Sequence, residues 1–326
     1  MLSYAFGEDG KAKKPDHLGI KAEARSPDPL VGMRDGRDGR VTRTVRRGSG
    51  WSFAGERATP WAVPTMTLPF FWVDAFSAQV FGGNPAGVVP LARWPEDALM
   101  QRIAAENGLS ETAFLVRTGP ERLQLRWFTP ACEVDLCGHA TLAAAFVTFA
   151  FTGQAGDRVV FDSRSGPLPV VRGADGSLEL DFPARPARPV PAPAGLLRGL
   201  GATPAFTAQA RDTLCVFATE AEVRALRPDF AVLAEVDTFG VIATAPGVEC
   251  DFVSRFFAPR AGVPEDPVTG SAHCTLVPYW AERLGRATLE ARQVSARGGR
   301  LRCTLDGERV RMAGHCALYL RGEIQV

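Results

Sequence analysis

The sequence has 326 residues, enough for about two ordinary domains, and its 46% hydrophobic and 22% charged residues are typical of a globular protein. No apolar run approaches the about 18 residues that a membrane span needs, and the N-terminus has no signal-peptide pattern, so we expect a cytoplasmic protein without a membrane partner. Residues 66–326 carry 25 basic and 28 acidic side chains, a balance that argues against a nucleic-acid partner.

Residues 1–65 differ in composition from the rest of the chain. They carry 12 Lys/Arg and 8 Asp/Glu, are rich in Gly, and follow neither a helical nor a strand period. We expect either a disordered tail or translated upstream sequence with the natural start at Met66, because strand-like sequence begins directly after that methionine.

From residue 66 to residue 184 the sequence predicts a first domain of alternating strands and helices. Pro95 suits the first turn of a helix and Gly108 its end, so a helix is predicted over residues 95–107. A second, strongly apolar helix is predicted over residues 140–149 and should be buried on most sides. Strands are predicted over residues 68–73, 88–89, 111–116, 123–128, 159–161, 168–172 and 178–182.

A proline-rich segment separates the two predicted domains. Five prolines lie between residues 183 and 195 and favour a semi-rigid, extended linker, so we place the domain boundary at residues 185–195. The second predicted domain covers residues 196–315 and includes a helix over residues 220–226. Further strands are predicted over residues 213–218, 241–245, 250–257, 293–296, 301–305 and 317–321.

The two domains share a weak internal repeat. Arg126-Trp-Phe-Thr-Pro130 matches Arg255-Phe-Phe-Ala-Pro259 after 129 residues, and a glycine then opens an apolar helix at Gly138 in one copy and, 132 residues later, at Gly270 in the other. Two such copies predict a pseudo-two-fold arrangement in which the two helix N-termini converge. Their free N–H groups and positive dipole ends would together bind a carboxylate.

Three side chains near these helix starts are candidates for acid–base chemistry. Glu111 lies on an otherwise apolar strand face, where partial desolvation favours a role as general acid or base. Asp266 precedes Pro267, which restricts it to an extended, fixed geometry, whereas Glu265 beside it is expected to be solvated. His139 directly follows Gly138, and because a helix N-terminus disfavours imidazolium, we expect a neutral imidazole.

Metal and nucleophile chemistry have weaker support. The seven cysteines are an odd number at scattered spacings, which predicts reduced thiols and no disulfide framework. Cys132, Cys137 and His139 resemble three zinc ligands, but no fourth ligand follows at a typical spacing, so no metal is predicted. The chain has no Gly-x-Ser-x-Gly elbow of a serine hydrolase and no phosphate-binding glycine motif, so no organic cofactor is predicted either.

Five motifs taken together resemble those of the phenazine-biosynthesis PhzF-like isomerases, a branch of the diaminopimelate-epimerase-like fold. The resemblance covers residues 70–324. It rests on Val73-Asp-Ala-Phe76, Gly83-Asn-Pro-Ala86, Asn107-Gly-Leu-Ser-Glu-Thr-Ala-Phe114, Cys137-Gly-His-Ala-Thr141 and Glu265-Asp-Pro-Val-Thr-Gly-Ser-Ala272.

The resemblance implies an α/β (α+β) fold of two pseudo-symmetric domains, each a curved mixed sheet wrapped around a central helix, with the site between them. We assign the C-terminal strand, about residues 316–326, to the first domain. The resemblance further implies a cofactor-independent isomerase of a small carboxylic acid, associated with phenazine synthesis and forming a homodimer. By motif position, the catalytic residues would be Glu111, His139 and Asp266, and the substrate-binding residues Gly138, Gly270, Ser271 and Asn84.

One departure separates this chain from the amino-acid epimerases of the same fold. Those enzymes have a cysteine at both helix starts, whereas here Cys137 stands at the first and Thr269 at the second. A threonine hydroxyl is too weak an acid to replace a thiol, so the sequence favours a carboxylate mechanism. The alternatives are a racemase or epimerase that uses Cys137, and a non-catalytic protein that binds small acids.

Overall fold

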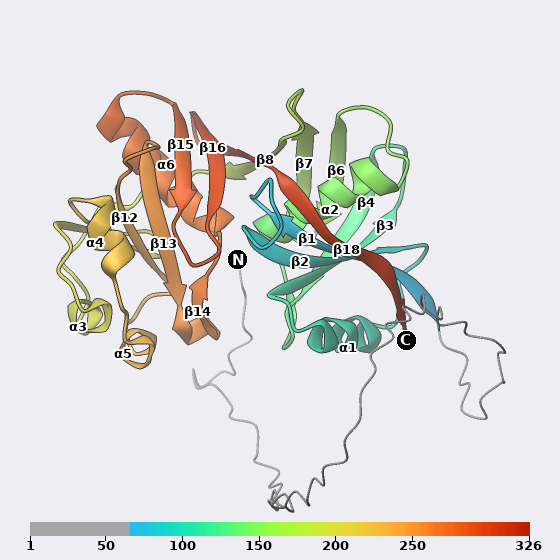
Figure 1. Ribbon diagram of the computed structural model, residues 1–326, viewed down its shortest axis with the longest axis horizontal. Coiled ribbons are helices and arrows are strands. Elements are labelled where there is room, and N and C mark those ends of the chain that lie inside the picture. The colour runs from blue at the N-terminus through green and yellow to red at the C-terminus, as the bar shows by residue number, and fades with distance from the viewer. Residues whose placement is uncertain (1–65) are drawn as a thin grey trace, which may run out of the picture. The chain divides into compact units, whose positions relative to one another are not determined.

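The computed structural model describes residues 66–326, and the predictions made for residues 1–65 lie outside these described residues. The described chain forms two halves, each built from a curved mixed β-sheet and one long central helix, α2 in the first half and α6 in the second (Figure 1). Within the described residues no helix is both long and apolar enough to cross a membrane.

The sheet of the first half is mixed. Its strands lie in the order β18-β1-β2-β3-β4-β6-β7-β8, with β2–β3 and β4–β6 parallel and the other neighbours antiparallel. The elements of this half are β1 (Thr67–Ala75), β2 (Asn84–Leu91), α1 (Asp97–Asn107), β3 (Glu111–Arg117), β4 (Arg122–Phe128), β5 (Glu133–Val134), α2 (Gly138–Phe151), β6 (Arg158–Ser163), β7 (Gly166–Arg172), β8 (Leu178–Pro183) and, from the end of the chain, β18 (Cys316–Gln325).

The second half repeats this pattern and joins the first through the antiparallel pair β8–β17. Its strands lie in the order β17-β16-β15-β13-β12-β11-β10-β9, with β13–β15 and β11–β12 parallel. The elements are β9 (Arg188–Pro189), α3 (Leu196–Leu200), β10 (Phe206–Gln209), β11 (Thr213–Val216), α4 (Glu220–Ala225), α5 (Phe230–Ala234), β12 (Val241–Pro246), β13 (Phe252–Ala258), η1 (Pro259–Ala261), β14 (Val263–Asp266), α6 (Gly270–Leu284), β15 (Thr288–Gln293), β16 (Gly299–Asp306) and β17 (Arg309–Gly314).

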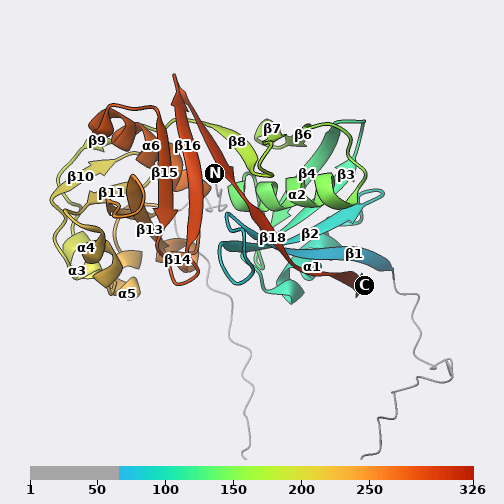
Figure 2. The same cartoon turned by 45° about the horizontal axis from the view of Figure 1, so that its top comes forward.

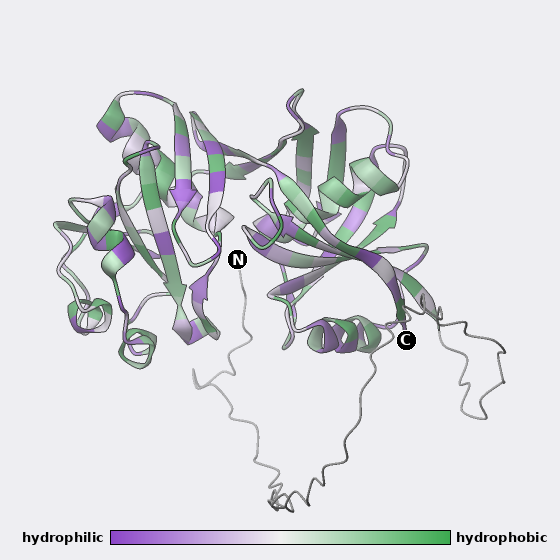
Figure 3. Cartoon of the chain, in the orientation of Figure 1, coloured by the Kyte–Doolittle hydropathy of each residue, from purple (hydrophilic) through white to green (hydrophobic). Residues whose placement is uncertain are grey.

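Helix α2 is the centre of the first half, as its composition predicts. Ten of its 14 residues are buried, and it packs against β1, β2, β3 and β8 (Figure 2). The buried hydroxyls of Thr141 and Thr148 donate to the carbonyls of Cys137 and Ala144 one turn earlier, so both hydroxyls have a hydrogen-bond partner inside the core. Along β4 in this half and β15 in the other, buried and more exposed positions alternate, as expected for sheets with one face on a core, and Figure 3 shows the hydropathy along the strands.

Helix α6 occupies the matching place in the second half and contains Pro278. Because proline has no N–H, the carbonyl of Cys274 one turn earlier cannot be paired within the helix. The backbone N–H of Arg185 donates to that carbonyl at 2.8 Å instead. The Pro-rich segment is further attached where Arg188 and Pro189 pair as β9 with β10. The predicted domain boundaries remain a prediction.

The internal repeat of the sequence has a structural counterpart. In the first half, Arg126 on β4 forms a bidentate ion pair with Glu133, with N–O distances of 2.6 and 2.8 Å. In the second half, Arg255 on β13 forms the same pair with Glu265, at 2.7 and 2.9 Å. The expectation of a solvated Glu265 was therefore wrong. Arg255 pairs with Glu265 in the second half, as Arg126 pairs with Glu133 in the first.

One predicted strand was misplaced. Residues 293–296 were predicted as a strand, but β15 covers Thr288–Gln293 and the chain then turns toward β16. In β15 the buried positions alternate as Leu289, Ala291 and Gln293, so this strand has the ordinary period of two. The strand was missed because its polar face carries Thr288, Glu290 and Arg292, which lower its apparent hydrophobicity.

Candidate active site

The two central helices begin side by side. A methyl group built on Gly138 would lie 3.8 Å from the Cα of Gly270, and one built on Gly270 would lie 3.9 Å from the Cα of Gly138. The residues before them, Cys137 and Thr269, are extended and form no side-chain cap on the helix that follows. The predicted convergence of the two helix N-termini is therefore present. Because neither N-terminus has a side-chain cap, their free N–H groups favour binding of an anion.

Glu111 and His139 form a close, buried pair beside these helix starts. Glu111 is the first residue of β3, and its Oε2 atom lies 3.1 Å from His139 Nε2, with only 12% and 7% of the two side chains exposed. The same Oε2 atom has no directed hydrogen-bond partner within the described chain, so the contact is an ion pair in which the N–H does not aim along the N–O line. The oxygen remains available to accept a further proton or hydrogen bond.

The charge state of His139 differs from the sequence expectation. Burial by itself would lower the pKa of the imidazole, but Cys137 and the Glu111 carboxylate beside it raise that pKa well above its usual value. We attribute the increase to Glu111, because burial also raises the pKa of the Cys137 thiol and so keeps that thiol protonated. This direction is opposite to the neutral imidazole that the sequence favours, because the adjacent carboxylate stabilises the protonated form.

Asn84 connects the two halves of the site. Its side-chain amide nitrogen lies 3.2 Å from His139 Nδ1 and donates at 2.8 Å to Asp266 Oδ1 and at 2.9 Å to the Val268 carbonyl. An amide nitrogen has only two hydrogens, and the carboxylate and the carbonyl are obligate acceptors, so these two take them. The Oδ1 atom of Asn84 is buried and has no partner among the described residues.

Asp266 is held by neighbours in the second half. The Thr269 hydroxyl donates to its Oδ2 atom, and Gln293 Nε2 donates to its backbone carbonyl at 2.7 Å. Gln293 also accepts from the Thr269 N–H at 2.9 Å. Burial, assisted by the Glu111 charge, raises the pKa of Asp266 to about 6, against the opposing effects of His139, Thr269 and Asn84. Both protonation states are therefore populated near neutral pH.

Sequence reasoning missed the roles of Thr269 and Gln293. Thr269 was considered only as a replacement for a catalytic thiol, whereas its hydroxyl holds the Asp266 carboxylate. Gln293 is 1% exposed, and a buried amide at the end of a strand is a signal that could have drawn attention to it.

Ser271, a predicted substrate-binding residue, contacts an arginine that the sequence did not single out. Arg211 Nη2 donates to Ser271 Oγ at 3.0 Å. The same guanidinium pairs with the buried carboxylate of Asp212 at 2.7 Å and lies over the ring of Phe239. Arg211 thus places positive charge beside the N-terminus of α6.

The cysteines do not assemble as the sequence spacing suggested. Cys132 Sγ lies 3.7 Å from the hydroxyl of Thr129, whereas Cys137 Sγ lies 3.5 Å from His139 Nδ1. Among the described residues, the group with metal-ligand spacing contains Cys137, His139 and Glu111 instead. The set of Cys132, Cys137 and His139 was therefore not a ligand set.

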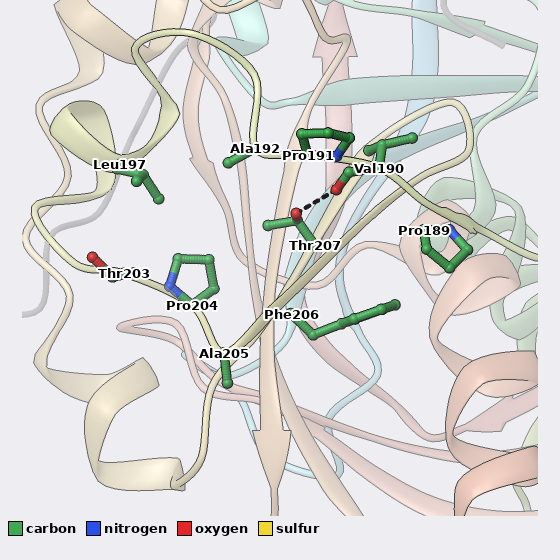
Figure 4. Close-up of a pocket in the computed structure, with 10 residues that line it drawn as sticks. All are labelled: Pro189, Val190, Pro191, Ala192, Leu197, Thr203, Pro204, Ala205, Phe206 and Thr207. Atoms are coloured by element: carbon green, nitrogen blue, oxygen red, sulfur yellow. Dashed lines mark hydrogen bonds between the residues drawn. The ribbon is translucent and has the colours of Figure 1, made fainter.

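A separate pocket in the second half has no acid–base chemistry. It is lined by residues 189–192, Leu197 and residues 203–207, and the Thr207 hydroxyl donates to the Val190 carbonyl at 2.6 Å beside it (Figure 4). None of these lining side chains is ionisable, and none belongs to the predicted site. The acid–base groups are concentrated at the two helix starts.

The contact between Thr269 and Asp266 makes a testable prediction about a pKa. Thr269→Val removes a hydrogen bond that stabilises the carboxylate, so the pKa of Asp266 is expected to rise above about 6. Thr269→Ser retains a hydroxyl and is the matched control. Carboxyl-carbon NMR of aspartate-labelled protein as a function of pH measures this value, and an equal pKa in both variants would contradict the assigned contact.

The same pKa gives a pH dependence of stability. The folded-state pKa of about 6 exceeds the ordinary aspartate pKa of 3.8, so the folded protein binds the Asp266 proton more tightly than the unfolded chain. This stabilising contribution is fully present below pH 3.8 and is lost as the pH rises through about 6. In Thr269→Val the loss is expected to extend to higher pH, which urea unfolding at several pH values measures.

The comparisons with known proteins point to the same family as the sequence motifs. Residues 73–322 match the family model described as phenazine biosynthesis-like protein. A Pseudomonas aeruginosa protein named as an uncharacterised isomerase is 55% identical, over 80% of this chain and 100% of that protein. The crystal structure of a PhzF-family phenazine biosynthesis protein from Enterococcus faecalis is 45% identical with a TM-score of 0.78, over 80% of this chain and 100% of that one.

A more distant solved structure shares the fold alone. A hydroxyproline epimerase from Agrobacterium vitis is 10% identical with a TM-score of 0.53, over 80% of this chain and 93% of that one. The predicted arrangement of two pseudo-symmetric halves around central helices is thereby confirmed.

Proposed function

The chain belongs to the phenazine biosynthesis-like protein family and is an isomerase, and from this premise we propose that it moves a proton within a small carboxylic acid without a cofactor. One observation carries the proposal: Glu111 pairs with His139, and Asn84 lies against that pair and donates to Asp266 in the other half. Three titratable groups with different surroundings thus lie around paired helix starts, the arrangement that acid–base catalysis requires.

The substrate carboxylate is bound by the helix starts. The N–H groups around Gly138–His139 and Gly270–Ser271 receive it, and Arg211, paired with Asp212, holds the Ser271 hydroxyl beside them. Because the two helix starts come from different halves, the carboxylate contacts both and fixes the substrate relative to the acid–base groups.

Glu111 performs the proton transfer. Its carboxylate takes a proton from an activated carbon and returns it to another position of the same conjugated system. His139, held protonated by Glu111, stabilises negative charge that develops on the substrate, and Asp266 exchanges a proton at its pKa of about 6. General acid–base catalysis supplies roughly 10²–10⁴-fold, so positioning and the anion site provide the remainder.

Deuterium uptake tests the reaction class. Conjugated unsaturated carboxylic acids incubated with the enzyme in heavy water are expected to exchange a carbon-bound hydrogen, which proton NMR detects. Binding of such an acid with no exchange and no isomerisation, across a panel that includes cyclic dienoic and aromatic amino acids, would contradict the proposal.

The setting of the reaction is also part of the proposal. We place it in phenazine-type secondary metabolism, carried out by a cytoplasmic homodimer. Phenazine genes beside this gene would support that setting, and a monomer in analytical ultracentrifugation would contradict the dimer.

A second candidate mechanism is a racemase or epimerase that uses Cys137. It is favoured by the position of Cys137 Sγ, 3.5 Å from His139 Nδ1 at the start of α2. Burial, together with the Glu111 charge, raises the pKa of this thiol, which opposes the thiolate that such a mechanism needs.

Cys137→Ala separates the two mechanisms. Under the carboxylate mechanism it is expected to reduce kcat by less than about 10-fold, because the thiol transfers no proton. A loss in the range of roughly 10²–10⁴-fold, the contribution of a general acid or base, would favour the thiol mechanism. Steady-state kinetics of Cys137→Ala and Cys137→Ser make the comparison.

A further inference from the structure

Three different kinds of metal ligand meet in the site. Cys137, His139 and Glu111 each offer one ligand atom, and these atoms all lie within 4.8 Å of one another. Across residues 66–326 this is the one group of His, Cys, Asp and Glu side chains with such spacing. A thiol, an imidazole and a carboxylate together form a donor set suited to zinc and similar divalent cations.

Of the separations between these atoms, the one between the imidazole and the carboxylate matches a bound ion. Zinc bonds of about 2.3 Å to sulfur and about 2.0 Å to nitrogen or oxygen give tetrahedral edges of about 3.5 Å between S and N and about 3.3 Å between N and O. His139 Nε2 lies 3.1 Å from Glu111 Oε2 and 4.0 Å from Cys137 Sγ. Cys137 Sγ, however, lies 3.5 Å from His139 Nδ1, so binding at Nε2 needs the Cys137 side chain to rotate away from Nδ1 toward Glu111.

Two further observations favour an ion at this point. Glu111 Oε2 is buried and contacts His139 Nε2 at 3.1 Å, and with no other hydrogen-bond partner among the described residues it has a lone pair left for an ion. All three residues are fixed by regular structure, with Glu111 beginning β3, Cys137 preceding α2 and His139 on its first turn. A rigid, partly desolvated donor set loses little conformational entropy when it binds an ion.

We infer that a thiophilic divalent cation of the Zn²⁺ class binds Cys137 Sγ, His139 Nε2 and Glu111 Oε2 and inhibits the enzyme. The Cys137 thiol releases its proton to the buffer as the S–metal bond forms, and His139 releases the proton on Nε2. Three protein ligands leave a fourth tetrahedral position for water or an anion. Inhibition rests on the proposed role of Glu111, whereas binding of the ion does not.

The proton release fixes the sign of the pH dependence. A thiol and an imidazole bind an ion only through a deprotonated sulfur or nitrogen atom, so the ion competes with protons for both ligands. Metal affinity is expected to increase with pH, by about 10-fold per pH unit for each proton displaced.

Cobalt spectroscopy tests the site without any substrate. Co²⁺ titrated into the full chain, with a thiol-free reductant, is expected to give thiolate-to-cobalt absorption in the near ultraviolet and intense visible bands of tetrahedral cobalt. Zn²⁺ is expected to displace the cobalt and remove both signals. Cys132→Ser is the matched control, since Cys132 contacts Thr129 outside the ligand group.

The variants decide the ligand set. Cys137→Ser is expected to remove the thiolate band and to weaken cobalt binding by more than the roughly 10–100-fold that loss of an outer-shell partner costs. Glu111→Gln is expected to retain the thiolate band with weaker affinity. Absence of the band in the wild type, its persistence in Cys137→Ser, or its loss in Cys132→Ser would overturn the inference.

A measurement on the unmodified protein covers the case in which a variant does not fold. The ¹¹³Cd NMR shift of the cadmium-loaded wild type reports the number of sulfur ligands, and one sulfur is expected; none, or two, would overturn the inference. Because these readouts need no turnover, failure of the metal site leaves the deuterium experiment informative. Conversely, a spectroscopically confirmed site without inhibition of isotope exchange would count against the catalytic role of Glu111.

Discussion

Glu111→Gln is expected to lower kcat by at least roughly 10²–10⁴-fold and to abolish deuterium uptake at the reacting carbon, because glutamine is nearly isosteric with glutamate but has no ionisable proton. The same substitution is expected to lower the pKa of His139, since the carboxylate 3.1 Å from its Nε2 atom is lost. Imidazole NMR during a pH titration measures the second effect independently of turnover.

Glu106→Gln is the matched control for this substitution. Glu106 is exposed on α1 and belongs to no part of the proposed site, so its charge removal is expected to leave both readouts unchanged. Retained isotope exchange in Glu111→Gln would remove Glu111 from the mechanism. An unchanged pKa of His139 would show that the Glu111–His139 ion pair does not control the charge of the imidazole.

Gly83→Ala is expected to destabilise the protein by about 3–5 kcal/mol, in the range of severe single substitutions. Gly83 has φ of 66°, and a Cβ there would lie 2.2 Å from the backbone oxygen of Ala75. The backbone is held on both sides, because the Gly83 N–H donates to the Gly298 carbonyl and the Gly83 carbonyl accepts from Arg297. The clash therefore cannot be relieved by a small local shift.

Gly108→Ala separates the clash from the conformational cost. Gly108 has a similar φ of 61°, but a Cβ there meets no atom within 4 Å, so only the left-handed backbone cost of about 1–2 kcal/mol is expected. Urea unfolding of both variants gives the difference. Gly83 precedes Asn84, so Gly83→Ala is also expected to impair isotope exchange, and equal stability losses in the two variants would show that the loop adapts.

Much of the site could be predicted because the repeat places both helix starts in the sequence. Glycines at 138 and 270 open buried helices, and motif positions identify Glu111, His139 and Asp266. That these residues lie together is established by the contacts through Asn84. Their catalytic and substrate-binding roles remain predictions.

The remaining features depend on contacts between distant segments, which local patterns do not encode. The raised pKa of His139 depends on Glu111, 28 positions earlier in the chain, which reasoning from the helix dipole alone does not include. The role of Gln293 depends on the end of β15 meeting Thr269, and that strand was itself misplaced in sequence. Likewise, Glu265 was taken as solvated because its partner Arg255 lies on another strand.

The pairing of β18 with β1 determines when the first half is complete during synthesis. Nine residues of β1 pair with the end of the chain, and one side-chain hydrogen bond in this ladder joins Thr67 and Gln325, 258 positions apart. During synthesis, one edge of β1 therefore stays unpaired until β18 has been made, although β2 can already pair with the other edge. Nascent chains that stall before β18 would expose this edge to neighbouring chains, and the ten residues of β18 cover it once they pair.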